Sequence, residues 1–147
     1  MKLDNETELA AVLAHAISHI ALRHSARFQT RIELLGLAYE GIPLDFVNVG
    51  VVMRSMGFRQ LASKFERDAD VLAAQIMAKA GYDPAGLLSF LRKLPATTGI
   101  MFSAFPNPQA RIQAVEEAIR LLPAATYRVD DGRFAMWKLA IGTADVL

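Results

Sequence analysis

The chain has 147 residues, 53% of them hydrophobic, with 16 basic and 15 acidic residues for a net charge of +1. This length suits one domain with its own core, and the balanced charge gives no argument for a nucleic-acid partner. Cysteine is absent, which excludes disulfides and thiolate metal sites, so any metal must be held by histidine and carboxylate. No stretch reaches the roughly 18 uninterrupted apolar residues of a membrane span.

A first helix is predicted from a cap at Asn5 to about Arg27. Asn5 followed three residues later by Glu8 resembles a capping box, which satisfies backbone amides left free at a helix start. Apolar residues then recur at helical spacing, at Leu9, Val12, Leu13, Ile17, Ile20 and Ala21.

The rest of the chain is predicted as helices separated by glycine and proline breaks. These helices cover residues 29–39, 58–80 (or 63–80), 84–94 and 108–122. Gly81 is expected as a C-terminal cap, and Asp83–Pro84 and Asn107–Pro108 as N-terminal caps followed by proline. Residues 44–56 indicate at most a short buried helix, and residues 97–106 a loop.

The C-terminal part of the chain leaves two interpretations open. Residues 127–129 and 133–139 flank an Asp-Gly pair, which is typical of a turn in a hairpin, but a terminal helix fits equally well. We therefore predict a mainly α-helical, single domain over residues 1–147, with at most a short C-terminal hairpin.

Two histidines four residues apart, His15 and His19, carry the clearest chemical signal. A helix turns about 100° per residue, so both imidazoles lie on one face, one turn apart, and can reach one ion. The segment matches the zinc-binding H-E-x-x-H pattern, in which the glutamate is the general base, except that Ala16 stands at the glutamate position. On a continuous helix His24 lies nearly opposite His15, so we expect it to pack or hydrogen-bond behind the site.

A catalytic zinc ion needs a third protein ligand and an open position, and Glu66 is the best candidate for that ligand. Glu66 and Asp70 lie four residues apart on a helix face otherwise made of Ala69, Ala73 and Met77, which indicates a packed face. Glu66 would bind the ion, and Asp70 would accept a hydrogen bond from the far nitrogen of a bound histidine. Spacing alone leaves open that all of these are ordinary helix residues.

Residues 8–24, ELAAVLAHAISHIALRH, resemble the motif helix of the HtpX-type and CAAX-prenyl-endopeptidase family of zinc metallopeptidases. Residues 65–70, FERDAD, resemble the second motif of that family, and residues 80–84, AGYDP, follow at the expected distance. Pro106 followed by Arg111 resembles a later signature that usually begins His-Pro. The resemblance covers about residues 8–120.

The resemblance implies one Zn²⁺ per chain, held by His15, His19 and Glu66, with Asp70 as the partner of a bound histidine. It implies a gluzincin metalloendopeptidase that hydrolyses peptide bonds through zinc-activated water. The substrate would be a protein or peptide in unfolded or extended form. Arg111 then becomes a candidate for supporting the site or contacting substrate.

Three departures from the family pattern matter. Ala16 cannot accept a proton, and general acid–base help is typically worth 10²–10⁴-fold, so we expect the chain to be inactive as written. Phe105 stands where the family often has histidine, so any support from that histidine is absent. The family normally has a strand-bearing segment ahead of Glu8, and a chain trimmed there would expose apolar surface that favours homo-dimers.

Two other interpretations stay open beside an inactive metallopeptidase domain. One is a natural zinc-binding pseudoprotease with a peptide-binding or chaperone-like role, and the other is a metal-free helical interaction module. The resemblance and the lack of a membrane span favour a soluble extracytoplasmic domain of a bacterium, periplasmic or membrane-associated.

Overall fold

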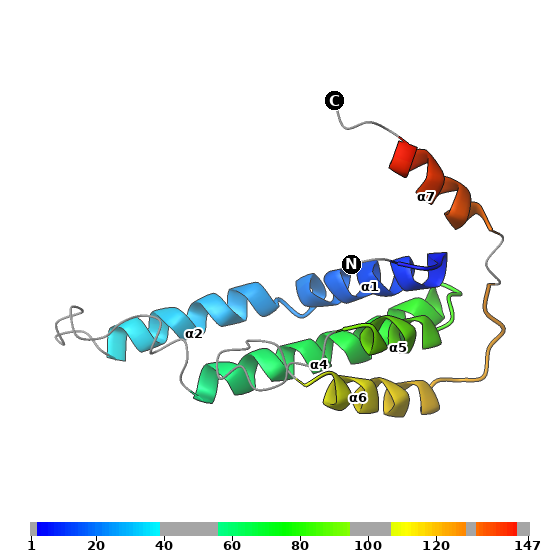
Figure 1. Ribbon diagram of the computed structural model, residues 1–147. Helices are drawn as coiled ribbons and strands as arrows, with labels where there is room; N and C mark the ends of the chain where they lie inside the picture. The colour runs from blue at the N-terminus through cyan, green and yellow to red at the C-terminus, as the bar shows by residue number, and fades with distance from the viewer. Residues whose placement is uncertain (1–2, 39–55, 95–106, 129–131, 144–147) are drawn as a thin grey trace.

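The computed structural model describes residues 3–38, 56–94, 107–128 and 132–143, which form six helices and no strand within those ranges. The helices are α1 (Glu6–Ala21), α2 (His24–Ala38), α4 (Met56–Lys79), α5 (Ala85–Arg92), α6 (Pro108–Arg120) and α7 (Arg133–Thr143). The long helix α4 packs against α1 and α6, and α5 packs against the same two helices (Figure 1). The mainly helical prediction is confirmed, whereas the predictions for residues 44–55 and 97–106 lie outside the described residues.

Three predicted helix ends are confirmed by their local chemistry. The Asn5 side chain accepts a hydrogen bond from the Glu8 backbone amide at 2.8 Å, and Asn107 accepts one from Gln109 at 3.0 Å. Each cap satisfies a backbone amide that has no partner within its helix. Gly81, after α4, has φ +82, a left-handed conformation that glycine adopts without steric cost.

The predicted C-terminal end of the first helix is wrong, because α1 ends at Ala21 and α2 begins at His24. Between them Arg23 has φ +54, a left-handed conformation that non-glycine residues adopt uncommonly. The Arg23 amide bonds to the Ile20 carbonyl at 3.0 Å, which closes the last turn of α1. No glycine or proline marks this break, so the periodicity of the segment does not reveal it.

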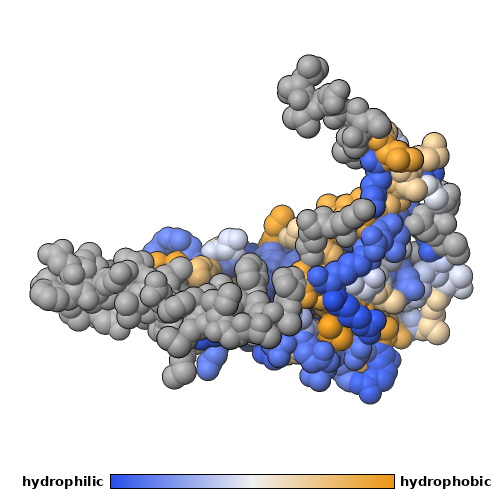
Figure 2. All heavy atoms as spheres, in the orientation of Figure 1, coloured by the Kyte–Doolittle hydropathy of each residue, from blue (hydrophilic) through white to orange (hydrophobic). Residues whose placement is uncertain are grey.

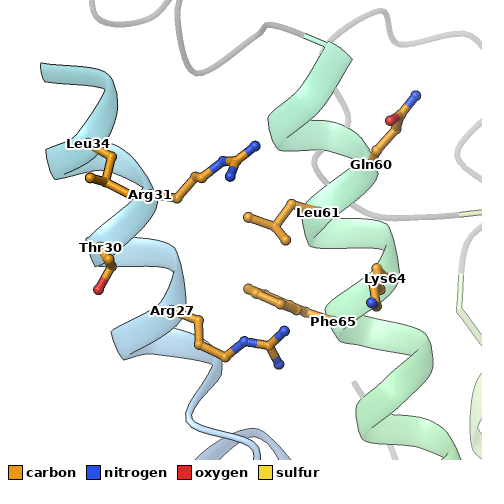
Figure 3. A pocket seen from close by; sticks show the side chains of 8 residues that line it. All are labelled: Arg27, Thr30, Arg31, Leu34, Gln60, Leu61, Lys64 and Phe65. Atoms are coloured by element: carbon orange, nitrogen blue, oxygen red, sulfur yellow. The ribbon is translucent and has the colours of Figure 1, made fainter. Parts of the chain in front are cut away.

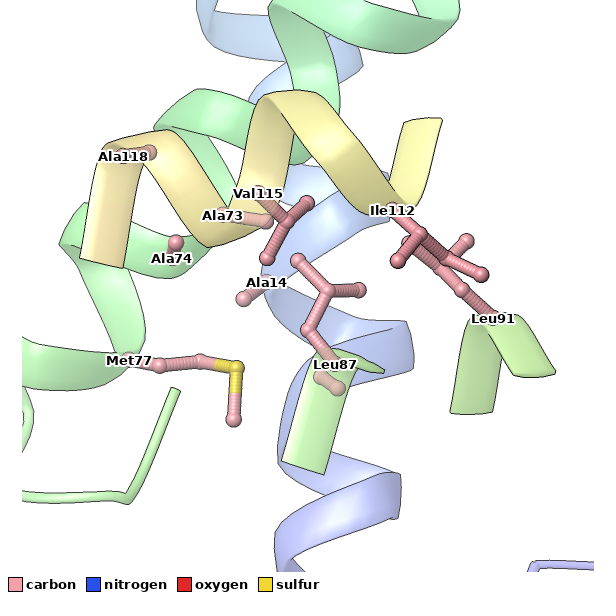
Figure 4. Packing of buried hydrophobic residues seen from close by; sticks show 10 residues of the cluster. Ala14, Ala73, Ala74, Met77, Leu87, Leu91, Ile112, Val115 and Ala118 are labelled. Atoms are coloured by element: carbon pink, nitrogen blue, oxygen red, sulfur yellow. The ribbon is translucent and has the colours of Figure 1, made fainter. Parts of the chain in front are cut away.

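The hydrophobic core lies between α1, α4, α5 and α6 (Figure 4). Small side chains such as Ala14 and Ala73 let α1 and α4 approach closely, and Met77, Leu87 and Val115 fill the space beside them. The buried cluster consists of Ala11, Ala14, Ala73, Ala74, Met77, Leu87, Leu91, Ile112, Val115 and Ala118.

The C-terminal segment adopts the helical alternative, because residues 133–143 form α7. Its side chains are largely exposed, with Met136 70% and Trp137 67% accessible, and the space-filling view shows apolar surface over this helix (Figure 2). The Lys138 ammonium donates to the Leu3 carbonyl at 2.9 Å. Among the residues described, no helix has the length and apolar character needed to cross a bilayer.

Candidate metal centre

Helices α1 and α4 bring His15, His19 and Glu66 together. The Nε2 atoms of the two histidines are 3.0 Å apart. The Glu66 carboxylate places Oε2 3.5 Å from Nε2 of His15 and Oε1 3.4 Å from Nε2 of His19. One ligand atom from each of the three residues can thus be chosen so that all lie within 4.8 Å of one another.

The three side chains suit a zinc ion because of their ligand atoms and because they are partly open to solvent. Two neutral imidazole nitrogens and one carboxylate oxygen form the His₂Glu set found in catalytic zinc sites. The side chains are 19%, 28% and 20% exposed for His15, His19 and Glu66, so the cluster opens to solvent on one side. A catalytic ion requires such an open side for water and substrate.

Asp70 and Arg111 support the cluster from the protein interior. Nδ1 of His15 lies 2.9 Å from Oδ1 of Asp70. Arg111, on α6, donates to Asp70 through Nε at 2.6 Å and Nη2 at 2.8 Å, and its Nη1 lies 3.1 Å from Oε2 of Glu66. Asp70 and Arg111 are 0% and 5% exposed. The bidentate pairing of Arg111 with Asp70 and its separate contact with Glu66 hold these two carboxylates in place.

The histidines of the cluster have pKa values shifted in opposite directions. Burial lowers the pKa of His15, but hydrogen bonds to Asp70 and Glu66 outweigh burial and raise it to about 9. Burial and the charge of His15 lower the pKa of His19. Burial alone would raise the pKa of Glu66, but the hydrogen bond to His15 and the charge of Arg111 lower it. At neutral pH the metal-free cluster therefore has a protonated, positively charged His15 beside a neutral His19 and the Glu66 carboxylate.

His24 lies beside His19, contrary to the position that a continuous helix predicts. The break at Arg23 starts a new helix at His24, so Nδ1 of His24 lies 3.0 Å from Nδ1 of His19. The His24 ring stacks on Phe65 with centroids 4.2 Å apart and planes 9° apart. His24 thus lies next to His19 because the helix breaks at Arg23, and not on the opposite face of one continuous helix.

Two other positions were singled out from the sequence, Ala16 and Phe105. Ala16 is exposed on α1, between the two histidines in sequence. Phe105 lies outside the described residues, so its contribution to the site stays a prediction.

A groove of about 590 Å³ lies between α2 and α4 (Figure 3), and one of its lining residues, Phe65, directly precedes Glu66 in the sequence. Arg27 and Arg31 of α2 and Lys64 of α4 line it together with Phe65. Arg27 also lies over the Phe65 ring, 4.9 Å from its centroid. Arg23, Arg27 and Arg31 recur four residues apart in the sequence, and the last two of them line this groove.

The chain is similar to a family of peptidases and to several known proteases. The sequence profile of Peptidase family M48 matches residues 1–119. The beta-barrel assembly-enhancing protease of Yersinia pestis is 30% identical over 92% of this chain and 32% of that relative. The protease of the same name from Escherichia coli K12 is 29% identical, over 62% of this chain and 22% of the relative. The mitochondrial metalloendopeptidase OMA1 of Schizosaccharomyces pombe is 28% identical, over 76% of this chain and 36% of that relative. The chain thus spans between 22% and 36% of the length of these relatives.

Proposed function

We propose that this chain, which belongs to peptidase family M48, is a zinc-binding metallopeptidase domain that keeps its metal ligands and lacks its general base. The observation that carries the proposal is the convergence of His15, His19 and Glu66 within 4.8 Å. Family M48 uses zinc, and these three residues would hold the ion. When bound, zinc would polarise a substrate carbonyl and lower the pKa of a water molecule.

The surrounding residues would keep the ligands in position. Asp70 would accept the Nδ1 proton of His15, so that the Nε2 lone pair points at the ion. Arg111 would hold Glu66 and Asp70 in one orientation, and its positive charge offsets part of their negative charge. This support is built from buried side chains, which lose little freedom when the ion binds.

Ala16 would remove the proton-transfer step. A methyl group can neither take a proton from water nor pass one to the leaving amine. Among the described carboxylates, Glu66 and Asp70 contact the two histidines, and both are already engaged by Arg111. Neither is therefore free to replace the missing base, and we expect hydrolysis slower by about 10²–10⁴-fold than with glutamate at this position.

Zinc content tests the metal site. Elemental mass spectrometry of the purified chain, after loosely bound ions are removed, should find about one zinc per chain. The Glu66→Ala variant should lose most of the metal, whereas Glu116→Ala, which removes an exposed carboxylate far along α6, should keep it. A chain that takes up no zinc when zinc is offered would show that the proposal is wrong.

Restoring the base tests the hydrolytic part of the proposal. With zinc bound, Ala16→Glu should cleave an unfolded protein such as casein about 10²–10⁴-fold faster than the chain as written. Ala16→Gln is the matched control, because its side chain has the same length and cannot accept the proton. If all three forms bind zinc and Ala16→Glu is no faster than Ala16→Gln, the zinc-binding pseudoprotease with a peptide-binding role becomes the better interpretation.

A further inference from the structure

His24 is a buried imidazole with no assigned role in the proposed metal site. It is 3% exposed, and its Nε2 has no hydrogen-bond partner within the described part of the chain. Burying an unpaired ring nitrogen is unfavourable. If this residue only packed on Phe65, an apolar side chain such as phenylalanine or leucine would be more stable there, because it buries no unpaired nitrogen. The histidine therefore points to a use for its other nitrogen, Nδ1.

The Nδ1 atom of His24 lies 3.0 Å from Nδ1 of His19. Two ring nitrogens this close form a hydrogen bond only when one of them carries a proton. If His19 binds an ion through Nε2, its single proton must sit on Nδ1. His19 then donates, and His24 accepts through Nδ1 while carrying its own proton on Nε2.

The other two ligand residues already have buried supports of their own. Asp70 lies against Nδ1 of His15 at 2.9 Å, and Arg111 lies against Glu66 at 3.1 Å. His24 occupies the equivalent place behind His19.

We propose that His24 is a positioning residue of the metal site, which accepts a hydrogen bond from Nδ1–H of His19 and so directs Nε2 of His19 at the ion. This inference rests on the proposed zinc-binding function. Outer partners of this kind fix both the tautomer and the ring orientation of a bound histidine.

The backbone break at Arg23 makes this contact. On a continuous helix, residues 19 and 24 would point about 140° apart, too far around the axis for their rings to meet. The left-handed conformation of Arg23, with φ +54, redirects the chain so that His24 opens α2 against His19. The uncommon positive φ of Arg23 is therefore the feature that positions His24. Backbone conformations of this kind are often found at functional sites.

His24→Phe is the decisive variant, because it keeps an aromatic ring on Phe65 and removes both ring nitrogens. Competition with a chromophoric chelator should show zinc binding about 10–100-fold weaker than in the unaltered chain. The melting temperature of the metal-free protein should stay the same or rise, because the unpaired Nε2 is gone. A purely structural role predicts the opposite, namely a lower melting temperature in the metal-free state.

Two further comparisons sharpen the test. His24→Asn offers an amide oxygen near the place of Nδ1, so it should retain more of the zinc affinity than His24→Phe. Arg23→Gly should keep the affinity, since glycine adopts positive φ freely, whereas Arg23→Val should lose it. In the zinc-loaded, unaltered chain, long-range ¹H–¹⁵N spectra should show His19 protonated on Nδ1.

Unchanged zinc affinity in His24→Phe would overturn the inference and leave the zinc-binding function standing. Equal losses of affinity and of metal-free stability in the Phe and Asn variants would assign His24 to packing and also overturn it. If the unaltered chain binds no zinc at all, the proposed function itself fails, and the two failures are therefore distinguishable.

Discussion

The proton on His15 is the residue-scale property with the most direct consequence for metal binding. Hydrogen bonds to Asp70 and Glu66 overcome the effect of burial and raise the pKa of His15 to about 9, from an ordinary value of 6.5. The neighbouring His19 has a lowered pKa because of burial and the charge of His15. At neutral pH the metal-free cluster therefore combines an imidazolium at His15 with a neutral imidazole at His19 and the ionised carboxylate of Glu66.

Zinc affinity should rise with pH. A histidine must be neutral to bind zinc, so below about pH 9 each zinc ion displaces one proton from His15. We expect the affinity to increase about tenfold per pH unit between roughly pH 7 and pH 9. Chelator competition at several pH values, with proton release followed in weak buffer, measures this slope.

Asp70→Asn is the control for this pH dependence. It removes the carboxylate that holds the proton on His15, so the pKa of His15 falls and the slope flattens above the new value. Zinc affinity that does not change with pH would contradict the assignment of the proton to His15.

At the scale of elements, α1 and α5 are joined by a buried carboxylate and by one close backbone approach. Glu8 of α1 is 1% exposed, and it accepts hydrogen bonds from Lys93, just after α5, at 2.5 Å and from Ser89 at 2.6 Å. Gly86 of α5 lies against the backbone of Thr7. These contacts set the position of the start of α1, the helix that carries His15.

Lys93→Met should destabilise the fold in a pH-dependent way. Burial would raise the pKa of Glu8, but hydrogen bonds from Lys93 and Ser89 lower it below its ordinary value of 4.5. A carboxylate with a lowered pKa stabilises the fold above about pH 4.5, and that contribution is lost as the pH falls through the folded-state value. Without the lysine, the melting temperature should drop clearly near pH 7 and less at a pH well below 4.5, where the stabilisation from the lowered pKa of Glu8 is lost.

Thermal unfolding followed by circular dichroism at the two pH values measures the effect. Lys93→Arg keeps the positive charge and should stay close to the unaltered chain. An equal drop at both pH values would show that Lys93 acts through packing and not through the Glu8 carboxylate.

Gly86→Ala should destabilise the α1–α5 contact. A Cβ at this position would overlap the Thr7 side chain and lie 3.0 Å from the Thr7 carbonyl oxygen. Overpacking of this kind typically costs about 1–3 kcal/mol, which exceeds the roughly 1 kcal/mol that alanine gains over glycine in a helix. Urea unfolding measures the net change.

Thr7→Ser in the Gly86→Ala background removes the overlapping methyl group and should recover part of the lost stability. A Gly86→Ala variant that is more stable than the unaltered chain would mean that α5 can move away from α1 without cost.

At the scale of the whole molecule, one side of α1 presents apolar surface to solvent. Leu13, Ile17 and Ile20 are 54%, 51% and 78% exposed. An apolar groove of about 250 Å³ lies beside the first two, lined by residues of α1 and α4 such as Leu9 and Ile76. Exposed apolar patches of this kind mark interaction surfaces. We expect the homo-dimer predicted from the sequence to form through this face of α1. The extracytoplasmic location stays a prediction.

Self-association should therefore depend on this face of α1. Sedimentation velocity over a range of concentrations should show a dimer, and the double variant Leu13→Lys with Ile20→Lys should shift it towards monomer. Leu121→Lys is the matched control, because Leu121 is 77% exposed but follows α6. A chain that is monomeric at all concentrations, or a control that dissociates equally well, would contradict this prediction.

Features that depend on neighbours within a turn or two of helix could be predicted from the amino-acid sequence alone. The helical class, the caps at Asn5 and Asn107 and the turn at Gly81 follow from local hydrogen bonding and backbone freedom. The pairing of His15 with His19 follows from helix geometry alone. A candidate third ligand, Glu66, also emerged from sequence, because the face around it is made of small apolar residues and the segment resembles a known motif.

Contacts that cross between elements are visible only in the folded protein. Arg111 meets Asp70 across 41 residues of sequence, a pairing that exists only because α6 packs on α4. The break at Arg23 has no local marker, since a non-glycine residue holds positive φ there only when surrounding contacts compensate. The position of His24 behind His19 was set in the same way. Local patterns encode interactions along one helix, whereas the support of the metal cluster comes from the packing of α1, α2, α4 and α6.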